Sequence, residues 1–291
     1  MFRKILIGVD GDQHDRDAVA LARRLATDET TLVLAHVHAG YPVTVKGNSG
    51  AYERILSENS ETLLKKISDQ TGIAATTSMG RASVGDGLHR LAEREEADLI
   101  VTGETRYGVI ARTLIGDDTH DTISDARCPV AVAPMNYAQA GGELHAIGVG
   151  YDGSPDSRVA LEFARSLAQE FHCRLDAFEV YDLHTRLGYA GLPAAELAAS
   201  QGSDSSDLLA ELGLEPRVTV GDPATELAVS STEVDVLVVG APALGHLRHL
   251  FHHSVSQQLA HVARCPLLVV PNGVSIATSG AAAESIPSPL S

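Results

Sequence analysis

The chain has 291 residues, of which 44% are hydrophobic, 21% are charged and 4% are aromatic. This length suits two domains of ordinary size, and the hydrophobic content is sufficient for two cores. The formal net charge of -16 disfavours nucleic acid and anionic membranes as partners, because an acidic surface repels both at long range. Stacking platforms for single-stranded nucleic acid are not expected either, since tryptophan is absent and other aromatic residues are scarce.

The N-terminal residues and the cysteines bear on the compartment. Residues 1–4 lead directly into an apolar strand without a recognisable signal peptide, and no apolar run approaches the roughly 20 residues of a membrane helix. We therefore expect a cytoplasmic protein with no membrane partner. The cysteines are Cys128, Cys173 and Cys265, an odd number without a Cys-x-x-Cys pair, which argues against a disulfide framework or a zinc ribbon. We expect Cys128 and Cys265 to be small buried hydrophobic residues.

One pattern of residues occurs twice, at a spacing of roughly 140 residues, over residues 4–134 and 145–271. Each copy begins with a short apolar strand that ends in Asp-Gly, at Asp10 in the first half and Asp152 in the second. Each copy ends with Ala-Arg-Cys-Pro and a further apolar strand. A duplicated domain carries two copies of any site, so the differences between the copies show which site has changed.

This repeat predicts two domains, at residues 1–138 and 139–272. The linker between them is residues 136–143, which contain a Gly-Gly pair. Residues 273–291 are rich in serine, alanine and proline, and we expect them to be a disordered tail.

In the first half, the hydrophobic pattern alternates between strands and helices. Asp12 is expected to cap the first helix. In the long helix, the residues expected to face inward are Ile55, Leu63, Leu64 and Ile67. The predicted elements, in chain order, are a strand at 5–9, a helix after Asp12, a strand at 32–37, a helix at 52–71, a strand at 74–78, a turn at 80–85, a helix at 87–96, a strand at 99–102, a helix near 117–125 and a strand at 130–133.

The second half follows the same order. Ser154 and Pro155 form a strong N-cap and first-turn pair for its first helix. The remaining predictions are a strand at 175–180, a loop or frayed helix at 183–207, a strand at 217–220 with its turn at 221–223, and strands at 236–239 and 267–270. Strands rich in β-branched residues that alternate with helices predict an α/β fold, in which a parallel sheet is covered on both faces.

In sheets of this kind, ligands bind beyond the carboxyl ends of the strands, where the strand order reverses. We expect the ends of the first, second and fourth strands of each half to meet there. The residues at these ends are Asp10, Val37 and Gly103 in the first half, and Asp152, Val180 and Gly240 in the second half. For the two aspartates, an alternative role is ordinary turn and cap chemistry, which also favours Asp-Gly after a strand.

On these motifs the chain resembles a tandem universal stress protein over most of its length. The resemblance implies two doubly wound domains, each with a five-stranded parallel sheet of order 3-2-1-4-5. In nucleotide-binding members, an aspartate after the first strand contacts adenine or its neighbourhood. A Gly-x2-Gly-x9-Gly-Ser/Thr loop after the fourth strand holds the ribose and phosphates of ATP or a related adenine nucleotide. Glycines let the backbone approach the anion, and the loop leads into a helix N-terminus.

The first half departs from this loop. Its positions fall on Gly103, Arg106, Gly116 and Asp117, with Thr119 as a nearby hydroxyl. A carboxylate at the phosphate-facing position repels the ligand. Arg106 offsets part of this repulsion as a phosphate partner, but places a large side chain where the family has none.

The second half departs differently, with Gly240, Ala243, His253 and Ser254 at the loop positions and Ser256 two residues further on. The second half keeps the hydroxyl side chains of the family's loop, but two of the loop's glycines are replaced. His253 matters only if that backbone needs a positive φ, which costs a residue with a side chain about 1 kcal/mol or more. We therefore expect the second half to be the better nucleotide site.

Residues 246–253 contain a run of histidines. If this run is helical, His246, His249 and His253 share one face, a spacing that can bind a transition metal. The alternatives are phosphate contact by Arg248 or a histidine, and a solvated helix face. We assign no metal site to the chain.

The sequence leaves three functions open. The first is a stress-response regulatory module that binds ATP or a relative without rapid turnover. The second is a nucleotide-free scaffold for protein–protein interaction. The third is an enzyme, at most a slow ATPase, because the chain has no Gly-x-Ser-x-Gly elbow and no Walker loop. The family's fifth strand commonly forms a dimer, so the resemblance implies an intramolecular pseudo-dimer in which Val130–Ala133 faces Leu267–Val270, with a homodimer of the whole chain as a further possibility.

Overall fold

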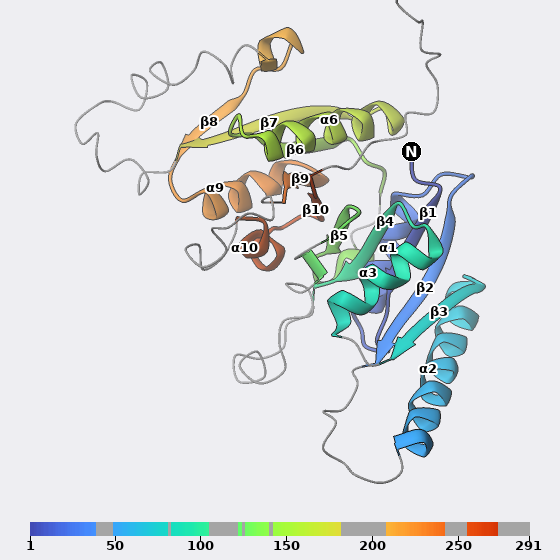
Figure 1. The fold of residues 1–291 in the computed structure, drawn as a ribbon. Coiled ribbons are helices and arrows are strands. Elements are labelled where there is room, and N and C mark those ends of the chain that lie inside the picture. The colour runs from blue at the N-terminus through green and yellow to red at the C-terminus, as the bar shows by residue number, and fades with distance from the viewer. Residues whose placement is uncertain are drawn as a thin grey trace, which may run out of the picture.

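The computed structural model describes residues 1–38, 49–80, 83–104, 122–123, 126–139, 142–181, 208–241 and 255–272. Both halves have the expected alternation of strands and helices (Figure 1). The first half contains β1 (Lys4–Gly8), α1 (Asp15–Arg24), β2 (Thr31–His38), α2 (Ser49–Thr71), β3 (Ala75–Gly80), α3 (Val84–Glu95), β4 (Leu99–Gly103), β5 (Val130–Ala133) and the 3-10 turn η1 (Tyr137–Gln139). The second half contains β6 (Ala146–Gly150), α6 (Pro155–Glu170), β7 (Arg174–Tyr181), β8 (Arg217–Val220), α9 (Pro223–Ser230), η3 (Ser231–Glu233), β9 (Val236–Gly240), α10 (Val255–Val262) and β10 (Leu267–Val270).

All the described strands belong to one sheet of order β3-β2-β1-β4-β5-β10-β9-β6-β7-β8. Every pair within a half is parallel. Each half thus has the order 3-2-1-4-5, and the prediction of two doubly wound α/β units is confirmed. The order reverses beside β1 in the first half and beside β6 in the second, which places a crevice at the end of each of these strands.

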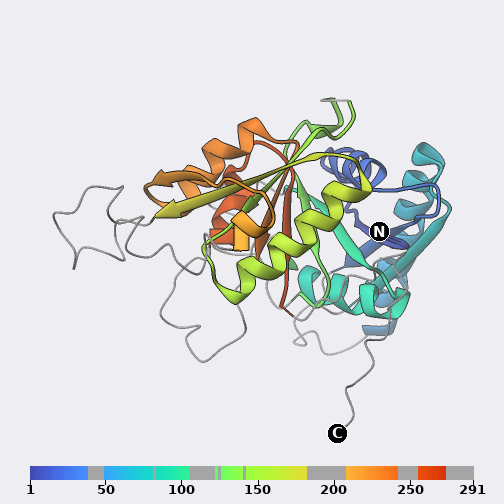
Figure 2. The same cartoon turned by 90° about the horizontal axis from the view of Figure 1, so that it is seen from above.

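The two halves join where β5 pairs with β10. This pair is antiparallel, with Ala131 opposite Leu268 in the register. The predicted pairing of Val130–Ala133 with Leu267–Val270 is therefore confirmed. Because β5 and β10 are antiparallel, the strands of the two halves run in opposite directions and their carboxyl ends lie on opposite sides of the sheet. Figure 2 shows the two halves side by side, the first in blue and green and the second in yellow to red. Among the residues that the structure describes, those that line the cavity at the end of β1 all belong to the first half.

Helices cover both faces of the sheet, which gives three layers. The alternation of side chains along β1 shows why: Ile5 and Ile7 enter one core and Leu6 enters the other, all fully buried. The first core packs against α1, α2 and α6 and contains residues from both halves. The second core packs against α3, α9 and α10. The sheet is thus buried on both sides, as its apolar strands require.

The segment between the halves is tied to α1. The two carboxylate oxygens of Asp17 accept hydrogen bonds from the main-chain N–H groups of Asn136, at 2.9 Å, and Ala138, at 2.8 Å. Arg24 donates to the hydroxyl of Tyr137 at 2.8 Å and forms an ion pair with Asp235 of the second half at 3.7 Å. These contacts fix the linker, so the two halves are connected by more than the strand pair.

The helix starts confirm one capping prediction and correct another. Ser154 caps α6 as predicted, since its hydroxyl accepts a hydrogen bond from the N–H of Ser157 at 3.2 Å. The prediction for Asp12 is wrong: α1 begins at Asp15, and the carboxylate of Asp12 accepts only from the N–H of His14, at 2.6 Å. The reason is that Asp15 turns back to the preceding loop, which delays the first helical turn.

A second correction concerns α2. Leu64 and Ile67 are buried as predicted, but Ile55 is 52% exposed. The helix is longer than the strands, so its first turns extend past the edge of the sheet (Figure 1). Of the other predictions, the helix near 117–125 is described only at residues 122–123, and the segments 183–207 and 273–291 lie outside the described residues.

Two further findings concern the cysteines and the membrane. Cys265 is buried as predicted, whereas Cys128 is only partly so. Burial raises the pKa of both thiols to about 12, which keeps them protonated near neutral pH. Among the helices that the structure describes, none combines the length and apolar character needed to span a bilayer.

Candidate crevice sites at the ends of β1 and β6

The crevice of the first half brings together the residues that we predicted to meet at the ends of the first, second and fourth strands. Asp10, Val37 and Gly103 line one small cavity, of about 70 Å³, at the carboxyl ends of β1, β2 and β4. His14 and Thr102 line it as well, although the sequence did not single them out. A cavity of this volume has room for several water molecules.

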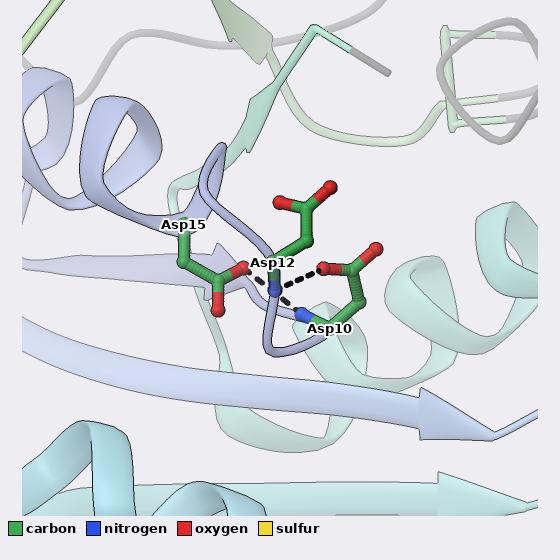
Figure 3. A group of neighbouring side chains, drawn as sticks. All are labelled: Asp10, Asp12 and Asp15. Carbon is green, nitrogen blue, oxygen red and sulfur yellow. Dashed lines mark hydrogen bonds between the residues drawn. The ribbon is translucent and has the colours of Figure 1, made fainter. Parts of the chain in front are cut away.

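Three carboxylates surround the turn after β1. Asp15 accepts hydrogen bonds from the N–H of Asp10 at 3.0 Å and from the N–H of Gly11 at 2.9 Å. Asp10 in turn accepts from the N–H of Asp12 at 3.0 Å. One oxygen of each carboxylate lies within 4.8 Å of an oxygen of each of the others (Figure 3). The hydrogen bonds to the main chain account for this grouping, so the cluster is explained by the turn itself.

The electrostatics of this turn are unusual. Burial, followed by the charges of Asp10 and Asp12, raises the pKa of Asp15 to about 6, although two N–H groups favour its charged form. Burial also raises the pKa of Asp10, and the charge of Asp12 adds to this effect. Asp10 and Asp15 therefore resist being charged together. A crevice of this character repels the phosphates of a nucleotide.

The second half builds the same turn from hydroxyls. Ser157 stands where the first half has Asp15, and it accepts the N–H of Asp152 at 3.3 Å. Ser154 stands in the place of Asp12, and its N–H donates to Asp152 at 3.0 Å. Burial alone would raise the pKa of Asp152, but hydrogen bonds from Ser154 and Ser157 outweigh it and hold the pKa below its usual value. Asp152 is thus a single, exposed and ionised carboxylate at the end of β6.

The glycines that end β4 and β9 have a packing role that the sequence analysis missed. A Cβ atom on Gly103 would lie 2.7 Å from the carbonyl oxygen of His14, and one on Gly240 would lie 2.5 Å from that of Asp156. Each glycine thus lets a strand end touch the first turn of the helix behind it. The sequence did contain a signal for this packing role, because both copies have glycine at this position.

Replacing Gly240 with alanine is expected to lower the free energy of unfolding by about 1–3 kcal/mol, because the new methyl group overlaps a main-chain carbonyl that cannot move freely. Urea denaturation checks this. Gly150→Ala is the matched control, since its Cβ would meet only the side-chain tips of Leu227, at 3.2 Å, and Val239, at 3.3 Å, which can shift. Equal losses for the two variants would contradict the packing role.

The remaining candidate residues fall into two groups. Val180 is partly buried on β7, and Ser256 is only 2% exposed near the start of α10, so its hydroxyl lies inside the protein. The loop candidates lie outside the described residues: Arg106, Gly116 and Thr119 in the first half, and Ala243, Arg248, His253 and Ser254 in the second half, together with the histidine run at 246–253.

The fold and the two crevices define a class of protein in which one doubly wound α/β domain is duplicated and the copies share a continuous sheet. Comparison with known proteins places the chain within this class. The chain belongs to the universal stress protein family, which matches it twice, over residues 1–134 and 143–271.

Individual proteins that are similar to this chain are also universal stress proteins. A universal stress protein of Mycobacterium tuberculosis is 31% identical over 185 residues, which are 60% of this chain and 62% of that protein, so the match spans less than two thirds of the relative. One of Mycolicibacterium smegmatis is 24% identical over 91% of this chain and 96% of its own length. Among solved structures, a universal stress protein from Archaeoglobus fulgidus superimposes with a TM-score of 0.65 at 15% identity, over 92% of this chain and 96% of that one. At that identity the likeness shows the fold.

Proposed function

We propose that the chain is a cytoplasmic stress-response regulatory protein that binds ATP or a related adenine nucleotide in the crevice of its second half. The two units are the domains 1–138 and 139–272, and binding proceeds with at most slow hydrolysis. The observation that carries this proposal is the contrast between Asp152, an ionised carboxylate held by two serines, and Asp10, one of three mutually repelling acids.

The position of Asp152 suits recognition of a nucleoside. It follows β6, beside which the strand order reverses, and crevices at that place commonly hold nucleotides. Its Oδ1 atom accepts the N–H of Ser154, which fixes the side chain. A carboxylate fixed in this way can accept hydrogen bonds from the adenine amino group or from ribose hydroxyls. Gly240 at the end of β9 keeps the neighbouring backbone close to the first turn of α6.

The crevice of the first half supports a different role. Its three carboxylates lie together in the crevice, and the charges of Asp10 and Asp12 oppose one another and that of Asp15, so the crevice disfavours an anionic ligand. We propose that this half serves mainly as a scaffold, which completes the shared sheet and supports the second half. This observation also favours the alternative of a nucleotide-free interaction protein, should the second crevice prove not to bind nucleotide.

The test is to extract small molecules from the purified full chain with acid and to titrate ATP calorimetrically. One adenine nucleotide per chain is expected. Asp152→Asn is expected to raise the Kd by roughly 10- to 100-fold, the effect of losing a hydrogen bond to a charged group. The matched variant Asp10→Asn, at the equivalent place in the first half, should change the Kd by less than about 3-fold.

The outcomes separate the proposals. Two nucleotides per chain would show that the first crevice binds despite its carboxylates. A weaker affinity in Asp10→Asn with no change in Asp152→Asn would show that the nucleotide binds in the first half, which contradicts the proposal. The absence of binding heat at millimolar ATP, with no nucleotide extracted, would overturn nucleotide binding and favour the scaffold function.

A further inference from the structure

The outer surface of the second half contains an apolar hollow between α9 and α10, which lie side by side (Figure 1). Its volume is about 440 Å³. Val229 on α9 and Val262 at the end of α10 line it, and they are 60% and 46% exposed. These are large exposures for two valines at one place, and an exposed apolar patch of this kind commonly marks an interaction surface.

The duplication supplies a comparison for this surface within the same chain. In the first half, α3 occupies the position of α9, because each helix follows the third strand of its half. The outer face of α3 is charged. Asp86 and Arg90 form an ion pair at 3.2 Å on this face, and Glu93 forms another with Arg127, which lies just before β5. The first half is thus covered by paired charges where the second half is apolar.

The replaced residues can be matched by counting from Leu88 and Leu227, which make the same contact with Gly8 and Gly150. On this alignment the charged residues of the first half are replaced by uncharged ones in the second: Asp86 by Thr225, Arg90 by Val229 and Glu93 by Thr232. Arg127 alone is kept, as Arg264. The second copy has lost both ion pairs of this surface and gained an aliphatic side chain.

The two halves also differ in the segment that follows their last strand. After β5, the chain is held against α1 by the hydrogen bonds of Asn136 and Ala138 to Asp17, and it continues into β6. After β10 come residues 273–291, which lie outside the described residues. Their sequence contains one charged side chain, that of Glu284, and no cation. The apolar hollow therefore occurs in the half whose last strand is followed by this further segment.

We infer that residues 284–290 of this chain, of sequence Glu-Ser-Ile-Pro-Ser-Pro-Leu, dock in the α9–α10 hollow. Ile286 and Leu290 supply the apolar side chains that cover Val229 and Val262. The composition of residues 273–291 disfavours a core of their own, but a short segment of such a chain can become ordered on a surface that binds it. This inference does not depend on nucleotide binding.

Charge favours this segment over an external partner. Arg264 is the charged residue among those that line the hollow, and it is exposed. Among the residues that the structure describes, its guanidinium forms no ion pair, in contrast to that of Arg127. A basic partner would meet Arg264 without a carboxylate to pair with, and an acidic partner would approach against the net charge of -16. A tethered segment needs no such approach, and the carboxylate of Glu284 is a partner for Arg264.

The length of the connection permits this docking. Eleven residues separate Asn272 from Glu284, and an extended chain of that length spans up to about 36–40 Å. Helix α9 has eight residues and is therefore only about 12 Å long. A short flexible tether gives its end an effective concentration of the order of millimolar, so the segment competes well with free partners. Pro287 and Pro289 restrict the unbound segment, which lowers the entropy that docking removes.

A single tryptophan tests this inference, because the natural chain has none. Leu290→Trp keeps its position apolar. In the full chain its emission is expected to be blue-shifted, and acrylamide should quench it at least roughly 3-fold less than free tryptophan, the effect of a docked population of about two thirds or more. The same protection is expected at about 1 and 100 µM protein, because segment and hollow belong to one molecule.

Two substitutions in the hollow should abolish the protection. Val229→Glu or Val262→Glu, added to the tryptophan chain, removes apolar surface and repels Glu284, so quenching should rise to that of free tryptophan. Arg264→Gln should weaken the protection in part, because it removes the cation. The matched controls are Val218→Glu, at an exposed valine on the edge strand β8, and Arg127→Gln in the first half, and both should leave the protection unchanged.

Circular dichroism and the melting temperature verify that each variant is folded. A fully quenched tryptophan in the chain without further substitutions would overturn the inference. Protection that persists in both Val229→Glu and Val262→Glu would place the segment elsewhere, and an equal loss in Val218→Glu would remove the link to the hollow. Protection that appears only at the higher protein concentration would assign the hollow to another molecule, which also contradicts docking of the chain's own segment.

Discussion

Replacing Leu268 with alanine is expected to lower the free energy of unfolding by about 3–5 kcal/mol, the range for a large cavity in a core that cannot collapse. Leu268 is fully buried in β10 and lies opposite Ala131 of β5. It belongs to a core cluster that contains residues of both halves. Its truncation therefore weakens the packing of each half and also the contact between them.

Urea denaturation followed by circular dichroism measures this effect. Val218→Ala is the control, because Val218 is 47% exposed and its truncation should cost less than about 1 kcal/mol. The unmodified chain should unfold in one transition, since its halves share a sheet and a core. A loss below about 1 kcal/mol for Leu268→Ala would show that the seam between β5 and β10 does not contribute to stability as the structure implies.

Asp15→Asn is expected to make the protein more stable near pH 7.5, by about 1–3 kcal/mol. The pKa of this buried acid is about 6, against an ordinary value of 3.8, so the folded state favours its neutral form more than the unfolded state does. The stability that this preference contributes is fully present below pH 3.8 and is lost as the pH rises through 6. The asparagine stays neutral at every pH. It has one acceptor oxygen instead of two for the N–H groups of Asp10 and Gly11.

The measurement is the difference in unfolding free energy between the variant and the unmodified chain from pH 4 to 8. This difference should be small near pH 4 and should grow through pH 6. Asp86→Asn, which removes an exposed carboxylate on α3, is the control and should show no such rise near pH 6. A constant difference across the range would mean that Asp15 does not titrate in this window.

The fold was predictable because its signals are regular. Apolar strands such as 5–9 and 130–133 alternate with helical spacing, and the repetition of the pattern fixes two equivalent units. The convergence of Asp10, Val37 and Gly103 on one cavity follows from the geometry of any parallel sheet of this order. The pairing of the last strands was predicted only from the resemblance to tandem universal stress proteins, in which the fifth strands commonly pair.

Other features depend on contacts that no local pattern encodes. Asp15 reads as an ordinary first-turn acid, yet its carboxylate turns away from the helix to hold the loop before it. Ile55 continues the apolar spacing of α2, but this part of the helix extends beyond the sheet, so its side chain is exposed. Gly240 was predicted as a ligand-binding glycine, and the structure adds a packing constraint at this position, its close approach to the carbonyl group of Asp156. Ile55 and Gly240 depend on distant parts of the chain, about which spacing gives no information. The partners of Asp15 lie only four and five residues before it, in a turn whose conformation the hydrophobic spacing does not reveal.

The antiparallel seam also has a consequence during synthesis. The first half is complete at residue 133, but β5 stays without its neighbour until residues 267–270 have left the ribosome. At usual rates of translation this delay is roughly ten seconds. Throughout that time the nascent chain presents an open, wholly apolar strand edge of sequence Val-Ala-Val-Ala, which invites pairing with another nascent chain. Early chaperone binding or slow expression should therefore favour the yield of native protein.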